Sequence, residues 1–203
     1  MPRLSAIIDD FAERFSFEKT KVASLARVMR EAGLITSGAR GVNAPPATAL
    51  DAARLLLAMM LDSKLATVVE DVEIVGAFTV LDRSQLSPGF QPTNLEDGIV
   101  RIFDFVAKSS IDQIADYSFN LSLTPWAALA EIMIGIYPED ERQETREIKI
   151  SFSHPDIDPD NITNLPEAYY AASRRFPVGF QQTATVHRDH LISIGRLIAD
   201  TEQ

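Results

Sequence analysis

Apolar residues recur at helical spacing through the first third of the chain. Residues 5–15 (SAIIDDFAERF) place their large apolar side chains on one side of a helix, and residues 20–31 repeat the pattern with intervals of three and four. Gly33 stands where a left-handed residue would end the second helix. Thr48 is a suitable N-cap for a third helix. The pattern predicts a mostly helical module over residues 1–83.

The middle of the chain contains a turn-rich connector. Residues 84–93 (SQLSPGFQPT) combine glycine, prolines and polar residues, which is typical of a boundary between two modules. Just before it, residues 72–81 (VEIVGAFTVL) are compatible with either a helix or a strand, because β-branched and aromatic residues crowd there. After it, Asn94 can cap a helix whose apolar side contains Ile99, Ile102, Phe103 and Val106.

Beyond this helix the period of the pattern changes to two. Residues 116–125 alternate apolar and polar positions, which indicates a half-buried strand. Residues 126–137 and 146–152 continue the pattern around a charged turn and predict a hairpin with a long loop. Residues 178–186 are a last candidate strand, before a closing helix that begins near Arg188. We therefore predict an α+β protein, whose second module (84–203) has an antiparallel sheet of three or four strands flanked by helices.

Composition narrows the classes of function. The 203 residues include no cysteine, which excludes a disulfide scaffold and a cysteine-ligated metal, and fits a cytoplasmic location. The longest apolar run, residues 126–137, is interrupted by Glu131 and is shorter than the about 20 residues that a spanning helix needs, so we expect no membrane contact. The sequence contains no G-x-S-x-G motif, no Walker loop and no G-x-G-x-x-G motif. We therefore expect neither an enzyme nor a cofactor.

Charge is distributed unevenly along this acidic chain. The net charge is −10, but residues 1–65 hold 9 Lys/Arg against 7 Asp/Glu. The remaining residues hold 19 − 9 = 10 against 29 − 7 = 22, a balance of −12. Any contact with nucleic acid is therefore expected from the N-terminal module.

A long loop interrupts the basic part of the chain. In residues 38–48 (GARGVNAPPAT) two glycines flank Arg40, so the backbone can approach a ligand closely while the guanidinium reaches out. Lys21, Arg27 and Arg30 lie on the helix before the loop. This arrangement predicts a loose, helix-turn-helix-like module that contacts the phosphates of double-stranded DNA, although the loop is too long for a compact motif.

The segment LARVMREAGLITSGARGVNAPPATALDAARLLLAMML, within residues 20–62, resembles the N-terminal segment of uncharacterised proteins encoded by phages and prophages. The resemblance implies a phage-associated role in DNA handling, such as small-terminase function or transcriptional regulation. The residues it implies as DNA contacts are Arg27, Arg30, Arg40 and Arg54.

Two alternatives remain open. The alternative to DNA binding is a structural or assembly component of a virion or another complex, which makes only protein contacts, as a homo-oligomer or with a protein partner. The arginines would then be solvated residues on helix faces. Separately, the acidic segment 156–167 (DIDPDNITNLPE) has the oxygen-ligand spacing of a calcium loop, but its prolines and the strand before it favour a plain turn. The ligands of such a loop would be Asp156, Asp158, Asp160 and Glu167.

Overall fold

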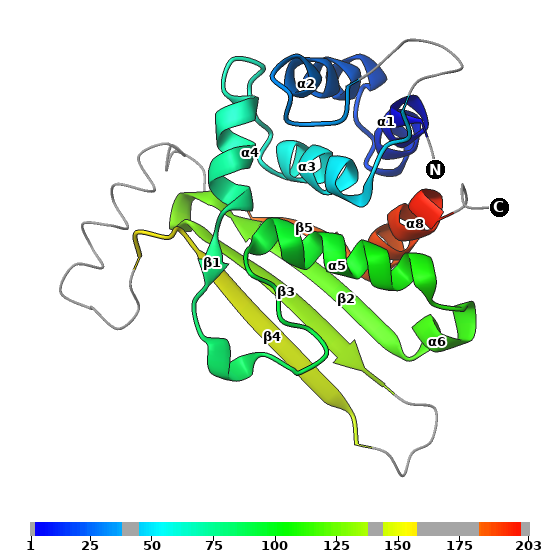
Figure 1. Cartoon of the computed structure of the whole chain (residues 1–203), viewed down its shortest axis with the longest axis vertical. Helices are drawn as coiled ribbons and strands as arrows, with labels where there is room; N and C mark the ends of the chain where they lie inside the picture. Colours follow the sequence, from blue (N-terminus) through cyan, green and yellow to red (C-terminus); the bar gives the residue numbers. More distant parts are fainter. Residues whose placement is uncertain (1–2, 38–44, 138–143, 158–182, 200–203) are drawn as a thin grey trace.

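The computed structural model describes residues 3–37, 45–137, 144–157 and 183–199 of the chain, and it has the predicted α+β architecture (Figure 1). The helices are α1 (Leu4–Arg14), α2 (Lys19–Glu31), α3 (Ala49–Met60), α4 (Val68–Gly76), α5 (Leu95–Lys108), α6 (Ile111–Ala115) and α8 (Arg188–Ala199), with short 3-10 turns η2 (Arg83–Gln85) and η3 (Pro125–Ala127). The strands are β1 (Thr79–Val80), β2 (Tyr117–Thr124), β3 (Leu129–Ile136), β4 (Arg146–Ser153) and β5 (Ala184–His187). No helix in the described ranges is long and apolar enough to cross a bilayer.

Three helix ends lie at residues whose side chains, or lack of one, favour the end of a helix. Thr48 and Asp51 form a capping box at the start of α3, in which each side chain accepts a hydrogen bond from the other residue's backbone N–H. Asn94 caps α5 by accepting a bond of 2.8 Å from the N–H of Asp97. Gly33 ends the α2 region with φ of +76°, a left-handed conformation that costs glycine little. These three predicted helix ends are confirmed.

The sheet contains five strands, one more than the upper limit of the prediction. Its order is β1-β4-β3-β2-β5, and every neighbouring pair is antiparallel. The additional strand is β1, which follows α4 after only two residues and pairs with β4. Residues 72–81 are therefore helical through Gly76 and extended at Thr79–Val80. The sequence left this segment open between helix and strand, and the predicted number of strands did not include β1, because so short a strand has no period of its own and is defined only by its partner.

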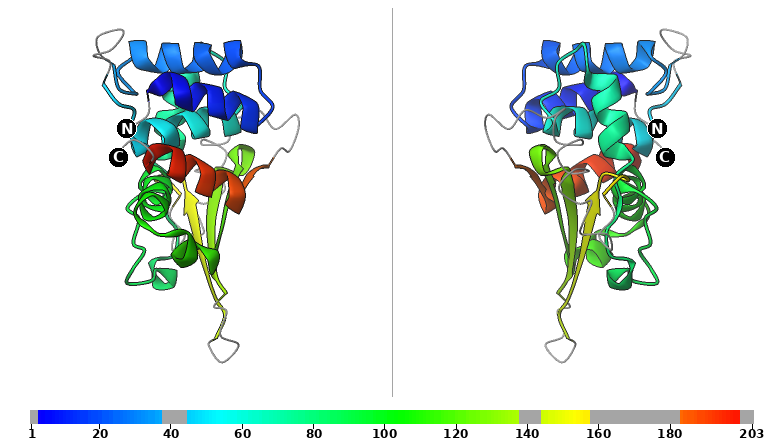
Figure 2. Two further views of the ribbon diagram at one scale, coloured as in Figure 1. Left: turned by 90° about the vertical axis from the view of Figure 1, so that its right-hand side faces the viewer. Right: turned by 90° about the vertical axis from the view of Figure 1, so that its left-hand side faces the viewer.

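Each strand of the central sheet has an apolar and a polar side. On β2 the apolar positions Phe119, Leu121 and Leu123 are buried, whereas the intervening serines and Asn120 face the opposite side. The views in Figure 2 show α5 against one face of the sheet and α1–α4 at one end of it, with β3 and β4 extending away from them at the other end. The alternation of apolar and polar residues along the strands thus determines which face of the sheet is covered.

Buried residues of the N-terminal helices and of the sheet belong to one contiguous core. Helix α5 packs against the sheet so closely that a Cβ on Gly98 would lie 2.7 Å from the Cδ1 atom of Ile132. Helix α5 also packs against α8, where a Cβ on Gly195 would lie 2.6 Å from Cγ1 of Val106. Helix α5 is therefore held closely by both the sheet and α8.

Candidate functional site

The cationic residues predicted to contact DNA differ in their surroundings. Lys21 forms an ion pair of 2.5 Å with Asp62 and lies over the ring of Phe17. Arg27 is exposed and pairs with Glu31 one turn along α2, at 3.3 Å. Each of these two cations therefore already has an anionic neighbour.

Arg30 is exposed on α2, as Arg27 is, so the two guanidinium groups stand on solvent-facing positions of one helix. Arg40 lies outside the described residues. Arg54 is directed inward: its guanidinium binds both carboxylate oxygens of Glu96 and the carbonyl of Leu34. The structure therefore engages Arg54 within the molecule, while Arg27 and Arg30 face solvent.

The proposed calcium ligands are described only in part. Asp156 has an exposed side chain, and its backbone N–H donates to Nδ1 of His154 at 3.2 Å. Asp158, Asp160 and Glu167 lie outside the described ranges. Among the residues that the structure describes, no group of three His, Asp or Glu side chains is placed to hold a metal ion.

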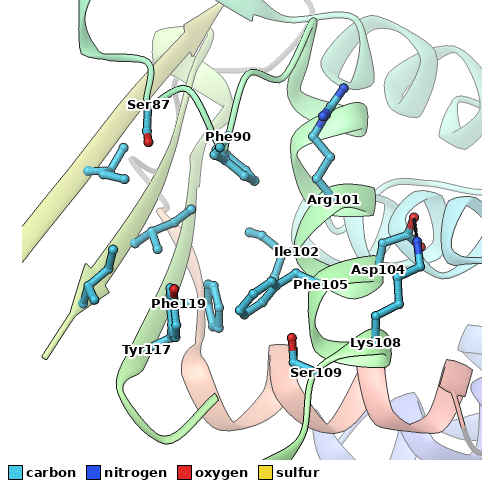
Figure 3. Close-up of a pocket in the computed structure, with 14 residues that line it drawn as sticks. Ser87, Phe90, Arg101, Ile102, Asp104, Phe105, Lys108, Ser109, Tyr117 and Phe119 are labelled. Atoms are coloured by element: carbon cyan, nitrogen blue, oxygen red, sulfur yellow. Dashed lines mark hydrogen bonds and ion pairs between the residues drawn. The ribbon is translucent and has the colours of Figure 1, made fainter. Parts of the chain in front are cut away.

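An apolar opening lies beside α5, on the face of the sheet that α5 covers. We call it the α5 cleft; its volume is about 480 Å³ (Figure 3). Its walls come from α5, from the loop after η2 and from the ends of three strands. The apolar residues of these walls are Phe90, Ile102, Phe105, Tyr117, Phe119, Ile134, Ile136 and Ile148.

The floor of the cleft is a row of side chains across β2, β3 and β4. Phe119 is opposite Ile134, and Ile134 is opposite Ile148, so the three point to the same side of neighbouring strands. Phe105 projects from α5 toward this floor, with its ring centroid 4.9 Å from that of Tyr117 and 6.0 Å from that of Phe119. The result is an aromatic cluster with one side open.

The rim of the cleft carries charges of both signs. Arg101 binds Asp97 with its Nε atom 2.9 Å from Oδ1, and Lys108 lies 3.3 Å from Asp104. Both pairs join residues four apart on α5, and Lys108 is 77% exposed. The Lys108–Asp104 pair is exposed, and exposed ion pairs contribute little to stability, so these two side chains are free to exchange partners.

A second groove, of about 470 Å³, lies between the N-terminal helices and β5. Phe15, Phe17 and Met59 contribute to its wall, and the Lys21–Asp62 pair stands beside them. Lys21 thus borders an apolar groove as well as the surface of α2.

Sequence reasoning did not identify the α5 cleft. Its walls are drawn from positions between Ser87 and Ile148, and only the tertiary structure brings them together. One signal was present: Phe105 lies off the apolar side of α5 that Ile99, Ile102, Phe103 and Val106 form. A large aromatic residue outside the core stripe of a helix indicates a second apolar contact.

Comparison with protein families, with curated proteins and with solved structures found no match to this chain.

Proposed function

We propose that the protein is a non-enzymatic assembly component that binds another polypeptide through the α5 cleft. The observation that carries the proposal is the combination of an open, aromatic-lined cleft with a rim of mixed charge. Protein interfaces have this anatomy, with aromatic and aliphatic side chains at the centre and polar groups around them. We include in the proposal a cytoplasmic location, which suits a chain without cysteine.

Two adjacent residues of β4 allow a matched test. Ile148 lines the cleft, whereas Lys149 projects from the opposite face of the sheet, where it pairs with Glu131 at 2.6 Å. A photo-crosslinking amino acid at position 148 should yield a discrete adduct with a partner protein in cells that produce this chain. The same group at position 149 should not give that adduct. The absence of a position-specific adduct would contradict the proposal.

Binding to double-stranded DNA is a second candidate function, favoured by one observation. Arg27 and Arg30 are both exposed on α2, the helix that precedes the segment containing Arg40. This surface is the one that the phage-associated, DNA-handling role would use. An electrophoretic shift assay tests it with wild type, Arg40→Ala and the double variant Arg27→Ala/Arg30→Ala. Phosphate contacts would make binding weaken steeply between about 50 and 200 mM salt, and no shift at low salt would exclude this candidate.

A further inference from the structure

We infer that the groove between the N-terminal helices and β5, which we call the β5 groove, binds an extended segment of another polypeptide. The segment would add to β5 as a sixth strand of the sheet, and every second side chain of it would lie against the apolar wall of the groove. The β5 groove is separate from the α5 cleft, so its proposed role does not depend on the function proposed for that cleft.

Strand β5 lies at an edge of the sheet, and in the sheet that the described residues form its only neighbour is β2. Successive residues of an antiparallel strand point their N–H and C=O groups to alternate sides. The carbonyl of Tyr117 accepts a hydrogen bond from Nε of Arg188, the residue after β5, so the odd-numbered residues of β2 point toward β5. Val186 is opposite Leu121 and therefore bonds to β2. The N–H and C=O groups of Thr185 then point outward.

This outward edge borders an apolar surface. The β5 groove has a volume of about 470 Å³, and Thr185 is one of the residues that line it. On the helical side of the groove, Phe15, Phe17 and Met60 are only partly buried. Methionine and aromatic side chains form favourable contacts with apolar partners of varied shape. The groove thus combines the free backbone groups of an edge strand with an apolar wall that a side chain can contact.

The combination selects an extended polypeptide. A helix bonds its own backbone groups internally, so it would leave the N–H and C=O of Thr185 without partners in the groove. An acyl chain would remove water from these groups without replacing its hydrogen bonds. Nucleic acid is disfavoured, because Lys21 and Asp62, the charged residues that line the groove, form a neutral pair and the chain has a net charge of −10. An added strand supplies both the backbone hydrogen bonds and the alternating side chains.

A displayed library of random linear peptides tests the inference. Peptides are selected on the wild-type protein and counter-selected on Met60→Lys, which places a charge on the apolar wall of the groove. We expect the enriched peptides to alternate aromatic or branched aliphatic side chains with polar ones, because only one side of an added strand faces the wall. Fluorescence anisotropy then measures the affinity of labelled peptides with the enriched sequences.

Two substitutions at one position separate strand addition from apolar contact alone. Thr185→Pro removes the outward N–H and no bond to β2, and proline is accepted in edge strands at such positions. We expect it to weaken peptide binding by about tenfold, because the peptide carbonyl loses its donor. Thr185→Val is the matched control, since it keeps the N–H, and should change the affinity little.

A third measurement uses only the wild-type protein and therefore does not depend on the folding of a variant. Each backbone nitrogen of an enriched peptide is methylated in turn. In an added strand only every second N–H points toward β5, so methylation should weaken binding at alternate positions and have little effect between them.

The other outcomes overturn the inference. If no peptide distinguishes wild type from Met60→Lys, the β5 groove is not a binding surface for polypeptides. If the enriched peptides depend on Met60 but bind Thr185→Pro normally and show no alternation on methylation, they do not add as a strand. If analytical ultracentrifugation shows a wild-type dimer that Met60→Lys abolishes, the occupant is a second copy of this chain. None of these results bears on the α5 cleft, which the crosslinking at position 148 tests separately.

Discussion

Arg54 and Glu96 join α3 to the first turn of α5 through a two-point ion pair. The Nε atom of Arg54 lies 2.6 Å from Oε2 of Glu96, and Nη2 lies 3.2 Å from Oε1. The side chains are only 22% and 20% exposed, and Nη1 of the same guanidinium binds the carbonyl of Leu34. One arginine therefore connects the end of the α2 region, α3 and α5.

Replacing this arginine should destabilise the fold. Arg54→Met leaves the carboxylate of Glu96 and the carbonyl of Leu34 without their donor, and we expect a loss of about 2 kcal/mol in the free energy of unfolding. Urea denaturation measures the loss, with Arg27→Met as control, because the exposed Arg27–Glu31 pair should contribute less than about 0.5 kcal/mol. Equal losses in the free energy of unfolding for the two variants would show that the Arg54 contacts stabilise the fold no more than an exposed ion pair does.

Asp97 should make stability depend on pH in the acid range. Burial alone raises the pKa of Asp97, but hydrogen bonds from the N–H of Thr93 and from Arg101 outweigh it, so the pKa lies below its ordinary 3.8. A folded-state pKa below the unfolded value means that ionised Asp97 stabilises the fold above about pH 4, and that this contribution is lost as the pH falls through the folded-state pKa.

Asp97→Asn should therefore be less stable than wild type at neutral pH, and the difference should shrink as the pH is lowered. Urea unfolding of both proteins between about pH 6 and pH 2 measures this convergence. A difference that stays constant across this range would contradict the assigned pKa shift.

Gly195 permits the close contact between α8 and α5. A Cβ at this position would lie 2.6 Å from Cγ1 of Val106 and 3.2 Å from the carbonyl oxygen of Phe103, which is backbone and cannot yield easily. Gly195→Ala should destabilise the protein, because overpacking costs about 1–3 kcal/mol and exceeds the gain of about 1 kcal/mol from the better helix former. Thermal unfolding measures the change. Gly89→Ala, where a Cβ would meet no atom within 4 Å, is the control.

Asp51 is 2% exposed and accepts hydrogen bonds with both carboxylate oxygens. Oδ1 accepts from the N–H of Thr36 at 2.7 Å, and Oδ2 accepts from the N–H of Thr48, also at 2.7 Å. Asp51→Asn offers a single acceptor oxygen, so one donor loses its partner, and we expect a cost of about 1–3 kcal/mol in chemical denaturation. Asp62→Asn, at a 65% exposed side chain, should cost much less. Unchanged stability in Asp51→Asn would mean that another group satisfies these donors.

The candidate site was only partly predictable. The alternation that defines β2 placed Tyr117 and Phe119 on the apolar side of a strand, and the helical pattern gave Ile102 its place on α5. Phe90 and Ile148 could not be connected to them, because a turn-rich connector and a separate strand carry no local signal of a shared surface. The inward direction of Arg54 was likewise hidden, since Glu96 is 42 residues away along the chain.

The sequence by itself determined the helix ends and the strand pattern that depend only on interactions between residues close together in the chain. Thr48, Asn94 and Gly33 mark helix ends because their side chains, or the lack of one, act on backbone groups within a few residues. The period of two between Tyr117 and Leu123 likewise defines a strand with one buried face. Only the tertiary structure decided the strand order β1-β4-β3-β2-β5, the pairing of β1 and the opening of the α5 cleft. These depend on contacts between segments far apart in the chain, for which no short-range pattern exists.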